Sequence, residues 1–159
     1  MENSNAVIGI GNPYRSDDGI GIYLVNKIRK KEHKEFSKVD FIDGGTGGMN
    51  LFHLISMYEA VILVDAVFFE GKPGEYLFFS TNEIHSSNKI TSTVSTHGSD
   101  IFTVIKSIKD IKENPPQIYV FGIQPASVSL SDKFSEEISE NIPLFIQKLE
   151  SEIKRILVV

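Results

Sequence analysis

Short apolar segments alternate with amphipathic segments along most of this chain. Residues 6–10, 39–43, 60–66 and 117–123 are short and apolar, and we predict that each forms a strand. A strand, a helix and a further strand together make the unit of a parallel sheet that is covered by helices. The alternation therefore predicts a three-layer α/β/α sandwich with a mostly parallel sheet.

The segments between these strands have helical periodicity. Apolar residues recur every three or four positions in residues 20–31, 101–111 and 138–156, and a shorter pattern of the same kind covers residues 49–57. Ser16 is placed to cap the first of these helices. Each helix is thus expected to bury one face against the sheet.

Three further features modify this pattern. Residues 75–79 are rich in aromatic side chains and are predicted to form an antiparallel hairpin partner, while the polar residues 80–96 form a candidate long loop. Pro143 lies inside the last helical pattern, where its missing N–H group predicts a break, a kink or a restart of the helix.

Length and composition are typical of one globular domain spanning residues 1–159, with 41% hydrophobic residues. The amino terminus lacks the basic region of a signal peptide, and no apolar run approaches the roughly 20 residues of a membrane span. We therefore expect a cytoplasmic protein without a membrane span. The formal net charge of -5 disfavours a nucleic-acid-binding protein, which needs a basic surface.

Acidic side chains follow the predicted strands. Asp17 and Asp18 come after the first strand, Asp43 ends the second and Asp65 ends the third. In parallel sheets, ligands bind at the carboxyl ends of the strands, so these acids are expected to meet at one edge. Each of them also has an ordinary structural explanation, since acids commonly cap helices or stabilise turns.

The most informative set combines Asp18 and Asp65 with His97, which lies just before a predicted helix. The chain has no cysteine, so a metal site must use carboxylate and imidazole ligands, and a cysteine protease is excluded. Two carboxylates and one imidazole suit nickel, zinc, cobalt or iron(II), and three protein ligands leave positions open for a substrate. The spacing alone does not establish such a site.

A glycine motif follows the first strand. Gly9-Ile10-Gly11 could begin a dinucleotide-binding loop, but Tyr14 stands where that fingerprint has its third glycine. We therefore favour a tight strand-to-helix turn, in which small residues are needed for close packing.

At this point the sequence resembles the hydrogenase maturation endopeptidases. The resemblance rests on the run GIGNPYRSDDGIG at residues 9–21, on VDA at residues 64–66, on STH at residues 95–97 and on GIQP at residues 122–125. It implies a twisted five-stranded sheet between helices. It also implies an endopeptidase that removes the C-terminal peptide of a nickel–iron hydrogenase large-subunit precursor after nickel has been inserted.

The resemblance implies that Asp18, Asp65 and His97 form the catalytic set and recognise the nickel of the substrate. The enzyme is then expected to be a monomer that holds no tightly bound metal of its own. Asp17 or Asp43 could assist the reaction. No G-x-S-x-G motif supports a serine nucleophile.

Two other functions remain open from the residues alone. One is a metallohydrolase with a resident zinc or iron that acts on small amides, and the other is a non-enzymatic binding chaperone for nucleotides or metals.

Gln124 stands where many family members have Glu. In this respect the chain resembles the branch of the family that acts on membrane-bound or multi-subunit hydrogenases.

Overall fold

The computed structural model describes residues 3–83, 94–95 and 100–158. In chain order its elements are β1 (Asn5–Gly9), the 3-10 helix η1 (Ser16–Gly19), α1 (Ile20–Lys30), η2 (Lys34–Phe36), β2 (Val39–Asp43), α2 (Met49–Ser56), β3 (Ala60–Phe68), β4 (Tyr76–Ser80), η3 (Thr81–Glu83), β5 (Val94–Ser95), α4 (Asp100–Ile111), β6 (Gln117–Ile123) and α5 (Glu136–Leu157). Most of the loop predicted over residues 80–96 lies outside the described residues. Within the described ranges, no helix is both long enough and apolar enough to cross a membrane.

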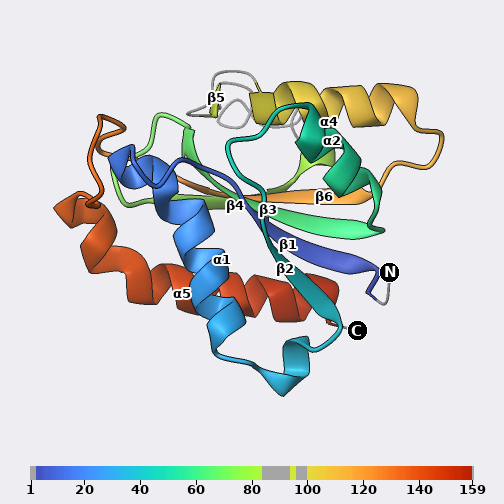
Figure 1. The fold of residues 1–159 in the computed structure, drawn as a ribbon, viewed down its shortest axis with the longest axis horizontal. Coiled ribbons are helices and arrows are strands. Elements are labelled where there is room, and N and C mark those ends of the chain that lie inside the picture. Colours follow the sequence, from blue (N-terminus) through green and yellow to red (C-terminus); the bar gives the residue numbers. More distant parts are fainter. Residues whose placement is uncertain (1–2, 84–93, 96–99, 159) are drawn as a thin grey trace.

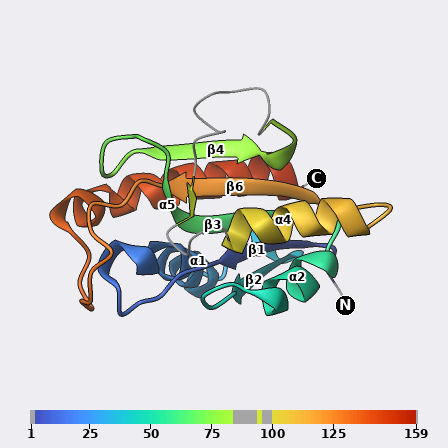
Figure 2. The same cartoon turned by 90° about the horizontal axis from the view of Figure 1, so that it is seen from above.

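The central sheet has the strand order β2-β1-β3-β6-β4 (Figure 2). The first four of these strands are parallel, and β4 at one edge runs antiparallel to β6. The two residues of β5 pair antiparallel with the end of β3. The predicted mostly parallel α/β sheet is confirmed, with five strands in the main path.

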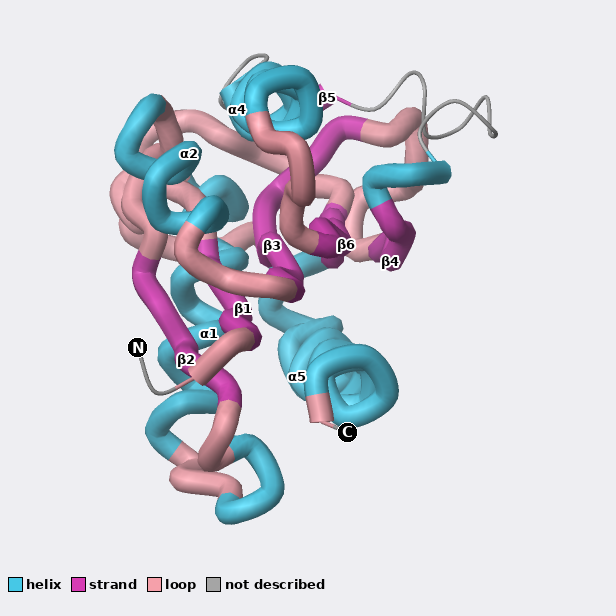
Figure 3. Tube along the Cα trace, turned by 90° about the vertical axis from the view of Figure 1, so that its right-hand side faces the viewer, coloured by secondary structure: helices cyan, strands magenta, loops and turns pink. Residues whose placement is uncertain are grey.

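Helices cover both faces of this sheet (Figures 1 and 3). The helices α1 and α5 lie on one face, and α2 and α4 lie on the other. Successive side chains of β3 alternate between the two sides, so that Ile62 packs with α1 and α5 while Leu63 packs with α2 and α4. Because both faces are covered, the sequences of the central strands are continuously apolar. The three-layer sandwich is thus confirmed.

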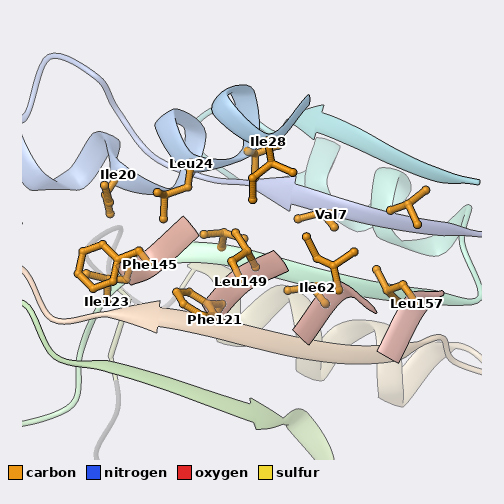
Figure 4. Packing of buried hydrophobic residues seen from close by; sticks show 14 of the residues in the cluster. Val7, Ile20, Leu24, Ile28, Ile62, Phe121, Ile123, Phe145, Leu149 and Leu157 are labelled. Atoms are coloured by element: carbon orange, nitrogen blue, oxygen red, sulfur yellow. The ribbon is translucent and has the colours of Figure 1, made fainter. Parts of the chain in front are cut away.

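The core between the sheet and the α1–α5 layer is built from aliphatic and aromatic side chains (Figure 4). Leu24 and Ile28 of α1 point toward the strands, and Phe145 and Leu149 of α5 do the same from the neighbouring helix. All four side chains are buried, at the three- and four-residue spacing that predicted these helices.

The prediction of a hairpin for residues 75–79 is only half correct. The segment is an antiparallel strand, but β4 pairs with β6 rather than with the preceding strand β3. Both sides of β3 are already occupied by β1 and β6, so β3 offers no free edge along its main part. Aromatic stacking holds β4 in place, with Phe78 and Tyr119 at 5.8 Å between ring centroids.

The helix α5 is continuous through Pro143, so the predicted break or restart does not occur. Ser135 caps its amino terminus and accepts a hydrogen bond from the backbone N–H of Ile138 at 3.4 Å. Ile138 and Phe145 on either side of the proline are both fully buried, and this packing offsets the missing helical hydrogen bond. Figure 1 shows that α5 bends in its amino-terminal part, as proline-containing helices do.

Candidate functional site

The carboxyl ends of β1, β2, β3 and β6 meet at one end of the sheet, which we call the carboxyl edge. The loops that follow β1, β3 and β6 extend from this edge to the left in Figure 1. Charged side chains at this edge are the candidates for chemistry, because the dipoles and backbone groups of strand ends and helix starts converge on it.

Asp18 lies on η1 and is 2% exposed. One of its carboxylate oxygens accepts a hydrogen bond from the backbone N–H of Asn12 at 3.0 Å, and its own N–H donates to the carbonyl of Arg15 at 3.1 Å. The loop between β1 and η1 therefore closes on this carboxylate. Because η1 also packs against β3, Asp18 is held rigidly at the carboxyl edge.

Asp65 is completely buried in β3, opposite Gly122 of β6. The sequence prediction that Asp65 ends its strand is wrong, because β3 continues to Phe68, where Val94 of β5 pairs with it. The paired partner explains the extension, since the hydrogen bonds to β5 keep the backbone extended. Strand alternation places Asp65 on the same side of the sheet as Leu63, which faces α2 and α4.

The structure thus brings Asp18 and Asp65 to the same edge on elements that contact each other. His97 lies outside the described residues, and its place in the predicted set stays a prediction. The elements on either side of it are described: β5 ends at Ser95, and α4 begins at Asp100. Within the described part of the chain, no three His, Asp or Glu side chains form a group that could hold a metal.

Asp17 has a different role from its neighbour. Its buried carboxylate accepts hydrogen bonds from the backbone N–H groups of Ala126 (2.8 Å), Ser127 (3.0 Å) and Ser135 (2.8 Å). The hydroxyl of Ser135 also donates to it at 2.8 Å. Asp17 therefore joins η1 to the loop after β6 and to the start of α5. With four donors from the protein around it, this carboxylate is not positioned to act on a substrate.

Asp43 stabilises a turn. Its Oδ1 accepts a hydrogen bond from the backbone N–H of Gly45 at 2.9 Å, as an Asx turn does, and the side chain is exposed. The predicted position of Asp43 at the end of β2 is confirmed, and its contact is with the turn rather than with Asp18 or Asp65.

Gln124 supports the connection that follows β3. Its Oε1 accepts hydrogen bonds from the backbone N–H groups of Phe69 (2.9 Å) and Gly71 (3.2 Å), and its backbone pairs with Gly74 and Glu75. Sequence reasoning singled out this position but assigned it no structural role. The sequence gives no sign of this role, because the loop that Gln124 binds lies more than fifty residues earlier in the chain.

The glycines of the first motif are required by close backbone packing. A Cβ atom at Gly9 would lie 2.6 Å from the carbonyl oxygen of Gly21, and one at Gly21 would lie 2.1 Å from that of Val64. The start of α1 is thus pressed against β1 and β3 without room for side chains. This geometry agrees with a tight strand-to-helix turn and gives the glycines a role other than phosphate binding.

Ser16 does not cap α1 as predicted. Its hydroxyl donates instead to the carbonyl of Lys133 at 2.9 Å, and its backbone N–H donates to the carbonyl of Ser131 at 2.8 Å. Ser16 is the first residue of η1, and the rest of this 3-10 turn separates it from Ile20, where α1 begins, so the hydroxyl is too far along the chain to cap that helix.

Comparisons with known proteins agree with this architecture. A family model described as hydrogenase maturation protease (HycI) matches residues 22–152. The hydrogenase 2 maturation protease of Escherichia coli (strain K12) is 25% identical to the chain over 123 residues, which cover 77% of this chain and 73% of that protein.

Two solved structures share the fold. The hydrogenase maturating endopeptidase HybD from Escherichia coli is 21% identical, with a TM-score of 0.77 over 95% of this chain and 92% of its own. The [NiFe] hydrogenase maturation protease HycI from Thermococcus kodakarensis KOD1 is 25% identical, with a TM-score of 0.71 over 96% of this chain and 93% of its own.

The match to the family model includes Asp65 and His97, and it begins after Asp18. It extends over well more than half of the chain. The protein is therefore a peptidase that belongs to the hydrogenase maturation protease family.

Proposed function

We propose that the protein removes the C-terminal peptide from the large-subunit precursor of a nickel–iron hydrogenase, and that it recognises the nickel already inserted in that substrate. The observation that carries the proposal is the placement of two buried acids, Asp18 on η1 and Asp65 on β3, on elements that contact each other at the carboxyl edge of the sheet. Carboxylates held in surroundings of low dielectric constant attract a cation strongly, and the nickel of the substrate is such a cation.

His97 completes the proposed set. What supports its inclusion is its place in the sequence, two residues after Ser95, which pairs with Val67 close to Asp65. Two carboxylates and one imidazole form a ligand set that accepts nickel without thiolates. Because tight thiolate ligands are absent from a chain without cysteine, we propose that the enzyme keeps no metal of its own and releases nickel with the product.

In this proposal the nickel of the substrate identifies a precursor that is ready to be cut. Docking of the metal on Asp18 and Asp65 would fix the scissile peptide bond beside it, where the metal can polarise the carbonyl or a water molecule. A precursor without nickel lacks this contact and stays uncut. The rigid anchoring of η1 by Asp17 keeps the position of Asp18 constant through this step.

The test is mass spectrometry of a nickel-loaded precursor before and after incubation with the enzyme. Wild-type protein should remove a C-terminal fragment, whereas Asp18→Asn, Asp65→Asn and His97→Ala should slow processing by at least about a hundredfold, the scale on which losing a metal contact acts. Asp43→Asn is the matched control, because it changes an exposed acid at the same edge. Full processing by all three site variants would exclude the proposed set.

Two results would indicate another function. Stoichiometric zinc or iron in the purified protein would indicate a metallohydrolase with a resident metal. Stable binding of the precursor without any change in its mass would indicate a chaperone.

A further inference from the structure

Two large apolar side chains stand out from the surface of the carboxyl edge. Leu130 is 85% exposed and Tyr14 is 73% exposed, which makes them the most exposed large apolar side chains of the described residues. They come from loops that are far apart in the sequence, one after β1 and the other after β6. Isolated exposed apolar residues are ordinary, but two on loops that are bonded to each other offer apolar surface to one partner.

Hydrogen bonds join the two loops into one unit, which we call the strap and define as residues 12–16 and 127–133. The backbone N–H of Ser131 donates to the carbonyl of Tyr14 at 2.9 Å, and Arg15 forms an isolated parallel bridge with Ser131. The side chain of Arg15 also donates to the carbonyl of Val128 at 3.0 Å. Figures 1 and 2 both show the two loops side by side.

The strap is continuous with the site at Asp18. The N–H of Asn12 bonds to the carboxylate of Asp18, and the carboxylate of Asp17 binds the N–H of Ser127 on the other loop. A molecule that covers Tyr14 therefore lies beside the loop that holds the Asp18 carboxylate. Because hydrogen bonds already fix the backbone of the strap, a partner that covers it has to order side chains only.

We propose that the strap is a docking surface for an apolar patch on the hydrogenase large-subunit precursor, an inference that rests on the proposed function. Its contacts add binding energy away from the metal and set the precursor over Asp18. A membrane is a poorer occupant, because the strap carries the acidic Asp132 next to Lys133 and the whole chain carries a net charge of -5. Continuity with the Asp18 loop favours the precursor over a second copy of this chain.

The test is steady-state processing of the nickel-loaded precursor by Tyr14→Ser and Leu130→Ser. Each should raise KM on the order of tenfold, since each removes a side chain whose burial is worth that factor or more, and each should leave kcat within about twofold. The controls are Ile111→Ser (71% exposed) and Met57→Ser (53% exposed), which remove apolar side chains outside the strap and should change KM by less than about twofold.

The outcomes separate this inference from the proposed function. If the wild-type protein does not cut the precursor at all, the proposed function fails and the strap loses its occupant. If cutting occurs and depends on Asp18 but KM is unchanged by the strap variants, the docking surface alone is refuted. A wild-type dimer that Leu130→Ser converts to a monomer, with KM unchanged, would assign the strap to self-association and also overturn the inference.

Discussion

Replacement of Asp17 by asparagine tests whether its carboxylate joins η1 to the loop after β6. Asparagine has the same shape, but one of its two terminal groups becomes a donor. The side-chain carbonyl of the introduced asparagine would take the position that receives three donors, and its amide would then face the N–H of Ser135, which is 2.8 Å from the carboxylate in the wild type. A charged hydrogen bond would be replaced by two opposed donors.

The magnitude follows from these contacts. Loss of one hydrogen bond to a charged group costs about 1.5–3 kcal/mol. The three remaining bonds weaken when the acceptor becomes neutral, but removing a buried charge relieves its desolvation cost, and the two effects oppose each other. We therefore expect Asp17→Asn to lower the free energy of unfolding by about 2–3 kcal/mol, or the Tm by roughly 5–10 °C in a protein of this size.

The assay is urea and thermal unfolding at neutral pH, followed by circular dichroism. Asp43→Asn is the matched control, since its exposed side chain makes one turn contact, and it should stay within about 0.5 kcal/mol of the wild type. Ser135→Ala keeps the backbone donor but loses the hydroxyl and the helix cap, and should cost about 1–2 kcal/mol. Wild-type stability in Asp17→Asn would refute the assigned role of this carboxylate.

Substitutions at three further positions have defined outcomes. Gly21→Ala should prevent stable folding or lower the Tm by more than about 10 °C in thermal unfolding, because the new Cβ atom would lie 2.1 Å from the carbonyl oxygen of Val64. The pKa of Tyr58 is raised from 10.0 to about 12, mainly by burial and to a smaller extent by its hydrogen bond to Asp40. Its contribution to stability should therefore be complete below pH 10 and be lost as the pH rises through 12, a decline that Tyr58→Phe should lack in unfolding measured against pH. Gln124→Ala should lose about 1–3 kcal/mol in urea unfolding. Gln124→Glu should lose less, since a carboxylate still accepts the two backbone hydrogen bonds, although its charge is costly in this buried position. Equal stability of these two variants would contradict the assigned contacts.

The secondary structure of the core could be predicted from the sequence because burial imposes a period. Ile62 and Leu63 are buried on opposite faces of one strand, and Leu24 and Ile28 share one face of a helix. Such spacing is local information, and it was sufficient for the elements and their layers. The partner of β4 is not local information, because periodicity states which face is buried but not which strand is adjacent.

The candidate site was predictable only in part, for a related reason. The positions of Asp18 and Asp65 at one edge follow from the parallel direction of the strands, since the carboxyl ends of parallel strands lie on the same side of the sheet. Adjacent acids such as Asp17 and Asp18 cannot be assigned different roles from the sequence, because the donors that occupy Asp17 come from residues 126–135. A long-range contact also explains why Ser16 does not cap α1. Its hydroxyl donates to the carbonyl of Lys133, which is far away in the sequence.

The place of α5 in the core has a consequence for how the protein forms during translation. This helix is the last element of the chain, yet it covers β1 and β3, and the side chain of Asn5 donates to the carbonyl of Leu157 at 3.1 Å. While the ribosome still holds residues 136–157, only α1 of the described helices covers that face of the sheet, and the apolar side chains that α5 buries in the native fold are exposed to other nascent chains. This face of the sheet should therefore reach its native packing only after α5 has left the ribosome.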